Sequence, residues 1–156
     1  MFKASRRHPA RPSRILFETP QMALNAWVHA IRHHSHQQIF DVFYADMRFF
    51  KPTLRPDPIP VEQAHSYFEE LKCLRNFHVR LNKAKITPCG NNRAIARGIY
   101  TFHFIGDDGH PQKLRAFFVF QLERQSRGWR MSEHISKKAH CNPSFKLRTP
   151  APQIGA

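Results

Sequence analysis

The feature that most constrains the fold is a change in hydrophobic period near residue 77. Before this point apolar residues recur at helical spacing, and after it apolar and polar residues alternate. The turn signals "CGNN", "GDDG" and "SRG" divide the alternating part into segments 77–87, 93–105, 113–124 and 128–136, which predict four strands in an antiparallel meander. Gly98 lies inside one segment and predicts a sharp bend or a close backbone approach.

Three helices are expected before the sheet. Thr19 is a suitable N-cap and Pro20 suits the first helical position, while 39–44 and 61–74 repeat the same apolar spacing. "MRFFK" predicts a short strand, and "PTLRPDPIP" a rigid loop because its prolines are excluded from a helix interior or central strand. We predict an α+β fold: a cone-shaped roll of N-terminal helices packed on a strongly curved, mostly antiparallel sheet.

The length of 156 residues fits one domain, which we place at 19–143, between a basic flexible tail at 1–18 and a flexible tail at 144–156. The formal net charge is +14 and is concentrated near both ends. Basic tails attract polyanions weakly and in a salt-dependent manner, but the charge favours solvated tails without a specific ligand.

Cellular location follows from two negative observations on the sequence. It contains no apolar run long enough for a membrane span or a signal-peptide core, so no membrane insertion is expected. Its cysteines, Cys73, Cys89 and Cys141, form no Cys-x-x-Cys pair, which fits a reducing compartment. We therefore expect a cytoplasmic protein.

Several strings occur in an order that resembles a known superfamily: "FYADM", "FFKPTL", "GIYTF", "DDGHP" and "WRMSEHISKKAHCNP". Over about residues 20–143 the chain resembles the nuclear transport factor 2-like (SnoaL-like, cystatin-like cone) superfamily. Within it, the chain looks most like the branch of the calcium/calmodulin-dependent protein kinase II association domain and its small bacterial relatives. The resemblance implies the fold but leaves the activity open, because this fold carries enzymes, binding modules and assembly hubs.

One subset of these relatives, the iota-class carbonic anhydrases, is metal-free and works through a small group of hydroxyls. The matching positions are Thr53, Tyr67 and Ser136, which the resemblance implies as catalytic candidates. Their hydroxyls would orient a water and hold a bicarbonate oxygen, while phenylalanine walls exclude solvent. The closing histidine–serine signature of the family is reduced here to His134, Ile135, Ser136 and Lys137, and all three hydroxyls also fit purely structural roles.

We expect an apolar pocket between the helices and the sheet that binds a small molecule or an anion. Arg115 is expected to replace a family arginine that usually stands at the position of Phe117. The predicted lining comprises Trp27, Phe43, Tyr44, Phe49, Tyr67, Tyr100, Phe102, Phe117 and His134, with Thr53, Arg115 and Ser136 as polar groups. No cofactor is expected.

Three functions therefore stay open. The first is a small-ligand or anion-binding domain that forms a homo-oligomer, most simply a dimer through the open sheet face. The alternatives are carbon dioxide hydration, as in the iota-class enzymes, and a non-catalytic oligomerisation module that resembles the kinase association domain. No metalloprotease, phosphate-loop or serine-hydrolase motif appears.

Histidines gather near the end of the first predicted helix, where His29 and His33 are four residues apart and His34 and His36 follow. This spacing brings imidazoles to one helix face. No carboxylate or cysteine nearby in the sequence completes a ligand set, so we predict no metal site.

Overall fold

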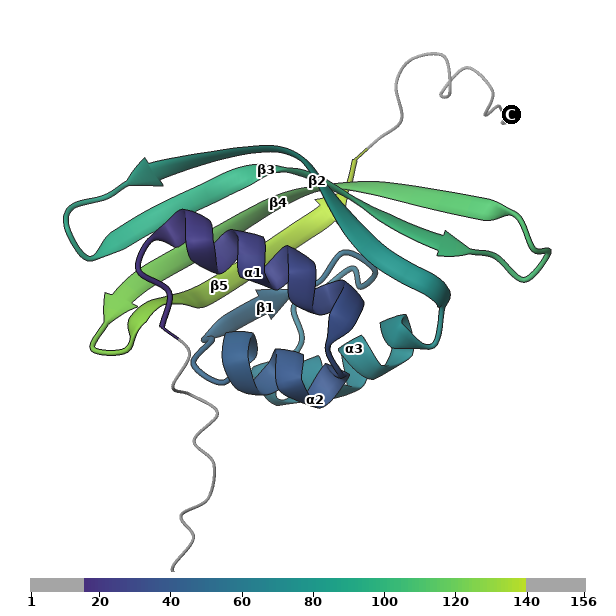
Figure 1. Ribbon diagram of the computed structural model, residues 1–156, viewed down its shortest axis with the longest axis horizontal. Helices are drawn as coiled ribbons and strands as arrows, with labels where there is room; N and C mark the ends of the chain where they lie inside the picture. The colour runs from purple at the N-terminus through teal and green to yellow at the C-terminus, as the bar shows by residue number, and fades with distance from the viewer. Residues whose placement is uncertain (1–15, 140–156) are drawn as a thin grey trace, which may run out of the picture.

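The structure is a computed structural model that describes residues 16–139, and it has a layer of helices on one side of a five-stranded sheet (Figure 1). The helical segments are α1 (Pro20–His33), α2 (His36–Ile39), a π-helix (Phe40–Tyr44), a 3-10 turn (Val61–Gln63) and α3 (Ala64–Lys72). The strands are β1 (Phe49–Lys51), β2 (Arg75–Pro88), β3 (Arg93–Ile105), β4 (Pro111–Gln125) and β5 (Gly128–Lys138). The predicted α+β fold is confirmed.

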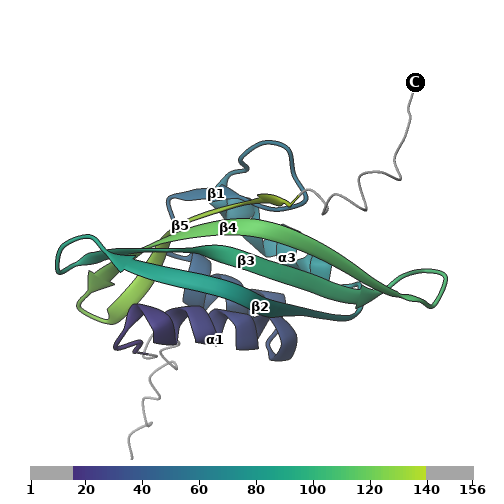
Figure 2. The same cartoon turned by 90° about the horizontal axis from the view of Figure 1, so that it is seen from above.

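The sheet has the order β1-β5-β4-β3-β2, in which β1 runs parallel to β5 and the other neighbours are antiparallel. The four long strands form the predicted meander, and the short first strand joins its far edge. All helices of the described part lie on one side of the sheet, and Figure 2 shows the face that they leave uncovered. We call this the outer sheet face.

The start of α1 follows the predicted rules for a helix N-terminus. The Thr19 hydroxyl accepts a hydrogen bond from the backbone N–H of Met22 at 3.1 Å, and Pro20 occupies the first helical position. The buried face of this helix consists of Ala23, Leu24, Trp27, Ala30 and Ile31. Its helical period therefore directs these side chains into the core.

Close contact between strands at Gly98 is also confirmed. Gly98 is paired with Ala84, next to a register shift between Leu81 and Lys83, and a Cβ atom at position 98 would lie 1.9 Å from the Lys83 carbonyl oxygen. Glycine is therefore required here for the strands to approach each other.

The core begins earlier in the chain than predicted. Phe17, which we placed in the N-terminal tail, is buried and stacks on Phe43 with 5.7 Å between ring centroids. Its carbonyl oxygen accepts a hydrogen bond from the backbone N–H of Trp129 at 2.8 Å. Residues 1–15 of that tail and the C-terminal tail at 144–156 lie outside the described residues. No helix within 16–139 is long and apolar enough to cross a membrane.

Candidate functional site

A buried chain of hydrogen bonds crosses the core from α1 to the loop after β1, and we call it the polar chain. Its members, in order, are Trp27, Tyr44, His134, Tyr100, Ser136 and Thr53. None of these residues is more than 7% exposed. Burial of so many polar groups requires that each one be hydrogen-bonded, and the distances between them show that they are.

The first half of the polar chain is centred on Tyr44. The Trp27 Nε1–H group donates to the Tyr44 hydroxyl at 3.1 Å, and this hydroxyl lies 2.6 Å from His134 Nδ1. His134 lies on the face of β5 that points into the core, and its ring stacks on Phe120 with 4.1 Å between ring centroids. Three separate elements thereby fix the imidazole ring in one orientation.

The second half is centred on Tyr100. His134 Nε2 lies 3.0 Å from the Tyr100 hydroxyl, which donates to the Ser136 hydroxyl at 2.8 Å. Thr53 Oγ1 lies 3.2 Å from the same tyrosine hydroxyl and forms a further hydrogen bond with Ser136. Two of the predicted catalytic hydroxyls, those of Thr53 and Ser136, are therefore in direct contact.

Burial keeps the titratable members of the polar chain neutral. It lowers the pKa of His134 to about 3, and it raises the pKa of Tyr100 to about 12. The pKa of Tyr44 is raised well above its ordinary value, again mainly by burial. The polar chain therefore carries no net charge at neutral pH.

The direction of the hydrogen bonds follows from the indole, which can only donate. Because Trp27 donates to Tyr44, the Tyr44 hydrogen is free to point at His134 Nδ1, and a neutral imidazole that accepts there carries its proton on Nε2. That Nε2–H donates to Tyr100, which donates onward to Ser136. The polar chain thus ends in the Ser136 and Thr53 hydroxyls, which hydrogen-bond to each other and to Tyr100.

Tyr67 is the third predicted hydroxyl and lies beside this end. Its side chain is buried, and its hydroxyl is near the Leu54 backbone without a hydrogen bond of good geometry within residues 16–139. Burial raises its pKa above the ordinary value. The Arg55 guanidinium lies 5.5 Å from the centroid of the Tyr67 ring, and Arg55 also pairs with Glu70 at 2.6 Å.

A second cation, Lys51, contacts the backbone at the same end. Lys51 Nζ donates to the Ser136 carbonyl oxygen at 3.2 Å. Lys51 and Arg55 were not among the predicted site residues, because lysines and arginines are common on surfaces and the sequence gives no signal that distinguishes these two. Lys51 therefore places one positive charge next to the backbone of Ser136.

Three predicted lining residues are placed wrongly. Phe49 and Phe117 are 39% and 47% exposed, and Arg115 is also exposed, so all three point away from the helices. Their neighbours Phe50 and Phe118 are buried instead. Strand side chains alternate between faces, and β1 and β4 carry apolar residues in both phases, so the inward phase could not be chosen from the pattern alone. The other predicted lining residues are buried in the core: Trp27, Phe43, Tyr44, Tyr67, Tyr100, Phe102 and His134.

The outer sheet face carries an exposed apolar patch. Phe117 pairs with Ile99 across the strands, and Val119 pairs with Ile135, which is 37% exposed. A hollow of about 620 Å³ lies on this face beside Gly98. Basic side chains border it, namely Lys83, Lys85 and Arg97.

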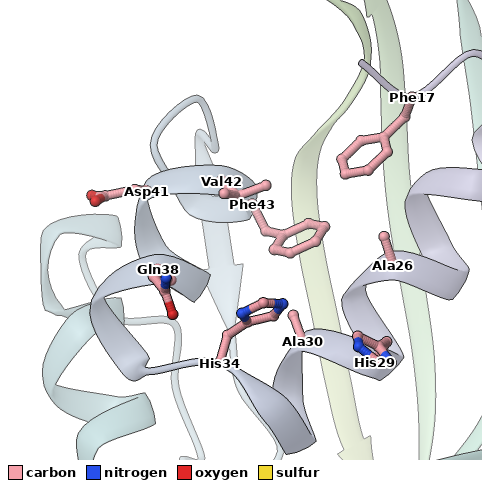
Figure 3. Close-up of a pocket in the computed structure, with 9 residues that line it drawn as sticks. All are labelled: Phe17, Ala26, His29, Ala30, His34, Gln38, Asp41, Val42 and Phe43. Atoms are coloured by element: carbon pink, nitrogen blue, oxygen red, sulfur yellow. The ribbon is translucent and has the colours of Figure 1, made fainter. Parts of the chain in front are cut away.

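A separate hollow of about 390 Å³ lies between α1 and the α2–π-helix segment (Figure 3). Phe17, Phe43 and Ala26 form apolar walls, and His29, His34 and Asp41 are its titratable groups. Of the residues predicted to line a pocket, Phe43 alone contributes to this hollow. The hollow is therefore distinct from the polar chain.

Comparison with solved structures gives the fold. A protein from Xanthomonas campestris, assigned to the calcium/calmodulin dependent protein kinase II association domains, has a TM-score of 0.66 and 20% identity and covers 74% of this chain and 82% of its own. A nuclear transport factor 2-like superfamily protein from Salmonella enterica has a TM-score of 0.62 and 16% identity, with 76% and 87% covered. A ketosteroid isomerase-like protein from Erwinia carotovora atroseptica has a TM-score of 0.64 and 11% identity, with 78% and 94% covered.

Comparison with curated proteins gave no match. The family model of the calcium/calmodulin dependent protein kinase II association domain matches residues 21–139, which is most of the chain and nearly all of the described part. This match agrees with the helices-then-meander order and with the cone-shaped fold. The chain belongs to the calcium/calmodulin dependent protein kinase II association domain family.

Proposed function

We propose that this domain binds a small anion at the Thr53 end of the polar chain and assembles with copies of itself through the outer sheet face. The observation that carries the first part is the contact between the Thr53 and Ser136 hydroxyls at the end of the polar chain, since an anion that replaces this contact receives a hydrogen bond from each hydroxyl. The charged oxygens of an oxyanion accept hydrogen bonds strongly, so an oxyanion complements a cluster of donors.

Charge supports an anion over a neutral ligand. Lys51 donates to the backbone of Ser136, and no carboxylate hydrogen-bonds with any member of the polar chain in the described part. The Tyr67 hydroxyl adds a third donor, which is costly to leave unpaired in the core. An oxyanion would satisfy it.

The close packing defines how an anion enters. Thr53 is the most exposed member of the polar chain at 7%, and it lies in the proline-rich loop between β1 and α3. The anion therefore approaches from this loop and replaces the contact between the Thr53 and Ser136 hydroxyls. Trp27 and Tyr44, at the other end, stay covered by α1 and the π-helix.

Calorimetric titration with bicarbonate tests this proposal. Thr53→Val removes the hydroxyl and keeps the shape, and we expect it to weaken binding at least about 10-fold, because a hydrogen bond to a charged group contributes about 1.5–3 kcal/mol. Thr101→Val is the matched control, since Thr101 is a buried threonine that bonds to Asn82 outside the polar chain. Equal weakening in both variants, or no binding by the wild-type protein, would refute the proposed site.

The same hydroxyls favour carbon dioxide hydration as a second candidate function. Thr53, Ser136 and Tyr67 are the matches to the metal-free iota-class enzymes, and the first two are in contact. Stopped-flow hydration assays on chelator-treated protein, with Ser136→Ala alongside, decide this point. Activity that survives the chelator and is lost in the variant supports catalysis, whereas activity at background leaves anion binding alone.

Self-association through the outer sheet face is the second part of the proposal. Membership of an association-domain family supports assembly. The patch around Phe117 and Ile135 is an apolar surface, and its exposure to water is unfavourable, so burial against a second copy would stabilise the assembly. A second copy of the same face is self-complementary about a two-fold axis. A dimer is the simplest such assembly.

Sedimentation of the full-length protein tests this assembly. Phe117→Asp places a charge in the centre of the patch, and we expect the assembly to dissociate while the fold is retained. Met22→Asp is the control, because Met22 is similarly exposed at 44% but lies on α1, on the opposite side of the sheet. A wild-type monomer, or a Phe117→Asp assembly of unchanged size, would contradict the proposed interface.

A further inference from the structure

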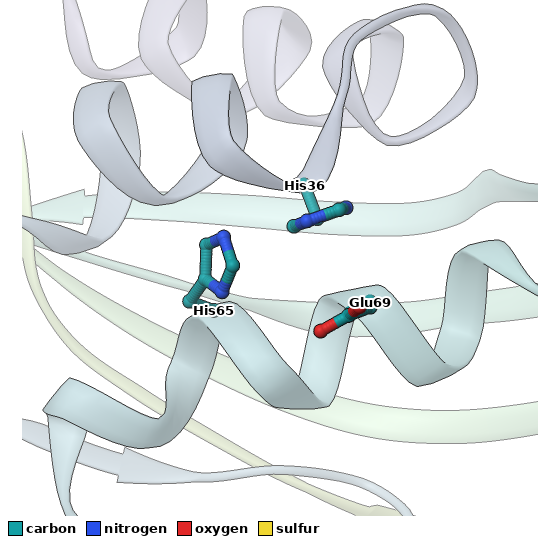
Figure 4. A group of neighbouring side chains, drawn as sticks. All are labelled: His36, His65 and Glu69. Atoms are coloured by element: carbon teal, nitrogen blue, oxygen red, sulfur yellow. The ribbon is translucent and has the colours of Figure 1, made fainter.

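Two histidines and a carboxylate from different helices converge on the helical layer, away from the polar chain. They are His36 at the start of α2 and His65 and Glu69 on α3 (Figure 4). One possible ligand atom from each residue lies within 4.8 Å of the others. Two imidazoles and one carboxylate form a ligand set that binds zinc in proteins.

The local structure fixes these three side chains next to one another. His65 and Glu69 are four residues apart on α3, so they lie on the same helix face one turn from each other. Ser35 and Gln38 form a capping box that fixes the backbone at the start of α2, where His36 lies. The two imidazole rings are 4.4 Å apart between centroids and meet at 74°.

The donor atoms are not used by other protein groups. Among residues 16–139, the side chains of His36, His65 and Glu69 make no hydrogen bond or ion pair. Lys72, on α3, donates to the Ile31 carbonyl oxygen at 2.6 Å, and Arg55, in the loop after β1, pairs with Glu70. Neither Lys72 nor Arg55 therefore forms an ion pair with the Glu69 carboxylate.

The separation fits a first-row divalent ion after a small adjustment. Tetrahedral zinc with ligands at about 2.1 Å requires ligand atoms roughly 3.4 Å apart. The ligand atoms lie within 4.8 Å of one another, so they must move closer to reach this separation. The two histidines are half-buried and Glu69 is exposed, so their side chains can rotate by this amount without disturbing the core. Three protein ligands leave one coordination position for water.

We propose that His36, His65 and Glu69 form a zinc-binding site that links α2 to α3. The π-helix that carries Tyr44 follows α2 directly, so the ion would also hold the segment that begins the polar chain. The ion would lie at the surface of the helical layer, and its role there is to stabilise the fold. This inference goes beyond the proposed anion binding, because it concerns other residues and another ligand.

Titration of the full-length protein with Zn²⁺, followed by thermal unfolding and by calorimetry, tests the site. We expect Zn²⁺ to raise the unfolding temperature of the wild-type protein. His65→Gln and Glu69→Gln should each weaken Zn²⁺ affinity at least about 10-fold, since even indirect changes at metal sites cost about 10- to 100-fold. Glu69 is exposed and the two histidines are half-buried outside the core, so these variants are expected to fold, which circular dichroism checks.

His29→Gln is the matched control. His29 also lies beside a histidine four residues away, His33, at 4.3 Å between ring centroids, but no metal-binding group of three in the described part includes this pair. We expect this variant to bind Zn²⁺ as the wild-type protein does. Equal affinity in His65→Gln and wild type, equal loss in His29→Gln, or no effect of Zn²⁺ on the wild-type protein would each overturn the proposal.

Discussion

Replacement of Tyr44 by phenylalanine gives the sharpest test of the polar chain. The Tyr44 hydroxyl accepts from Trp27 Nε1 and contacts His134 Nδ1, and both of these partners are at most 3% exposed. Its removal leaves one buried donor and one buried acceptor without a partner. Each such atom costs about 1–3 kcal/mol, so we expect Tyr44→Phe to lower the free energy of unfolding by roughly 2–6 kcal/mol.

Tyr67→Phe is the matched control for this measurement. Tyr67 is also buried in the same core, but its hydroxyl lacks a hydrogen bond of good geometry in the described part, so its removal should leave the free energy of unfolding unchanged or raise it. Urea unfolding at one fixed protein concentration, followed by tryptophan fluorescence, measures both variants. Similar losses in the two variants would refute the assigned role of Tyr44.

Two further predictions concern other parts of the core. Burial lowers the pKa of His134 from 6.5 to about 3, so its contribution to stability is complete above pH 6.5 and is lost as the pH falls toward 3. Between pH 7 and pH 5 this loss is about 2 kcal/mol, and the stability difference between wild type and His134→Gln should shrink by that amount in unfolding curves; parallel pH profiles would contradict it. Gly98→Ala should lower the free energy of unfolding by about 1–3 kcal/mol or more, because its Cβ would meet the Lys83 carbonyl oxygen at 1.9 Å. Gly106→Ala is its control, since that Cβ would meet only flexible side chains at 3.2 Å, and equal losses would show that the backbone contact is not the cause.

Much of the fold was predictable because the hydrophobic period and the turn and cap residues indicate the same elements along the chain. The segment 93–105 was predicted with the bounds of β3, and Thr19 and Pro20 begin α1 as expected. The parallel pairing of β1 with β5 was not predicted. Phe49 to Lys51 pair with Glu133 to Ile135 more than 80 positions along the chain, and nothing in either short segment specifies a partner at that distance.

The candidate site was predictable in its hydroxyls and less so in its geometry. Thr53 and Ser136 were identified by resemblance and lie in contact, but the resemblance did not indicate that Tyr100 joins both of them to His134. Such a network depends on which side chains face each other across the core. Arg115 was wrongly predicted to line the pocket for a related reason. It lies on the same face of β4 as the exposed Phe117.

The π-helix explains how Tyr44 reaches His134. The sequence predicted an ordinary helix at 39–44, in which five residues advance by about 500° and leave the side chains of Ile39 and Tyr44 roughly 140° apart. In the structure the π-helix spans Phe40–Tyr44, and Ile39, Phe43 and Tyr44 are all buried. The wider turn brings residues five apart onto nearly the same face, which an α-helical turn does not do. Tyr44 can therefore point at the imidazole while Ile39 still packs in the core, so the irregular turn is a condition for the polar chain to begin at Trp27.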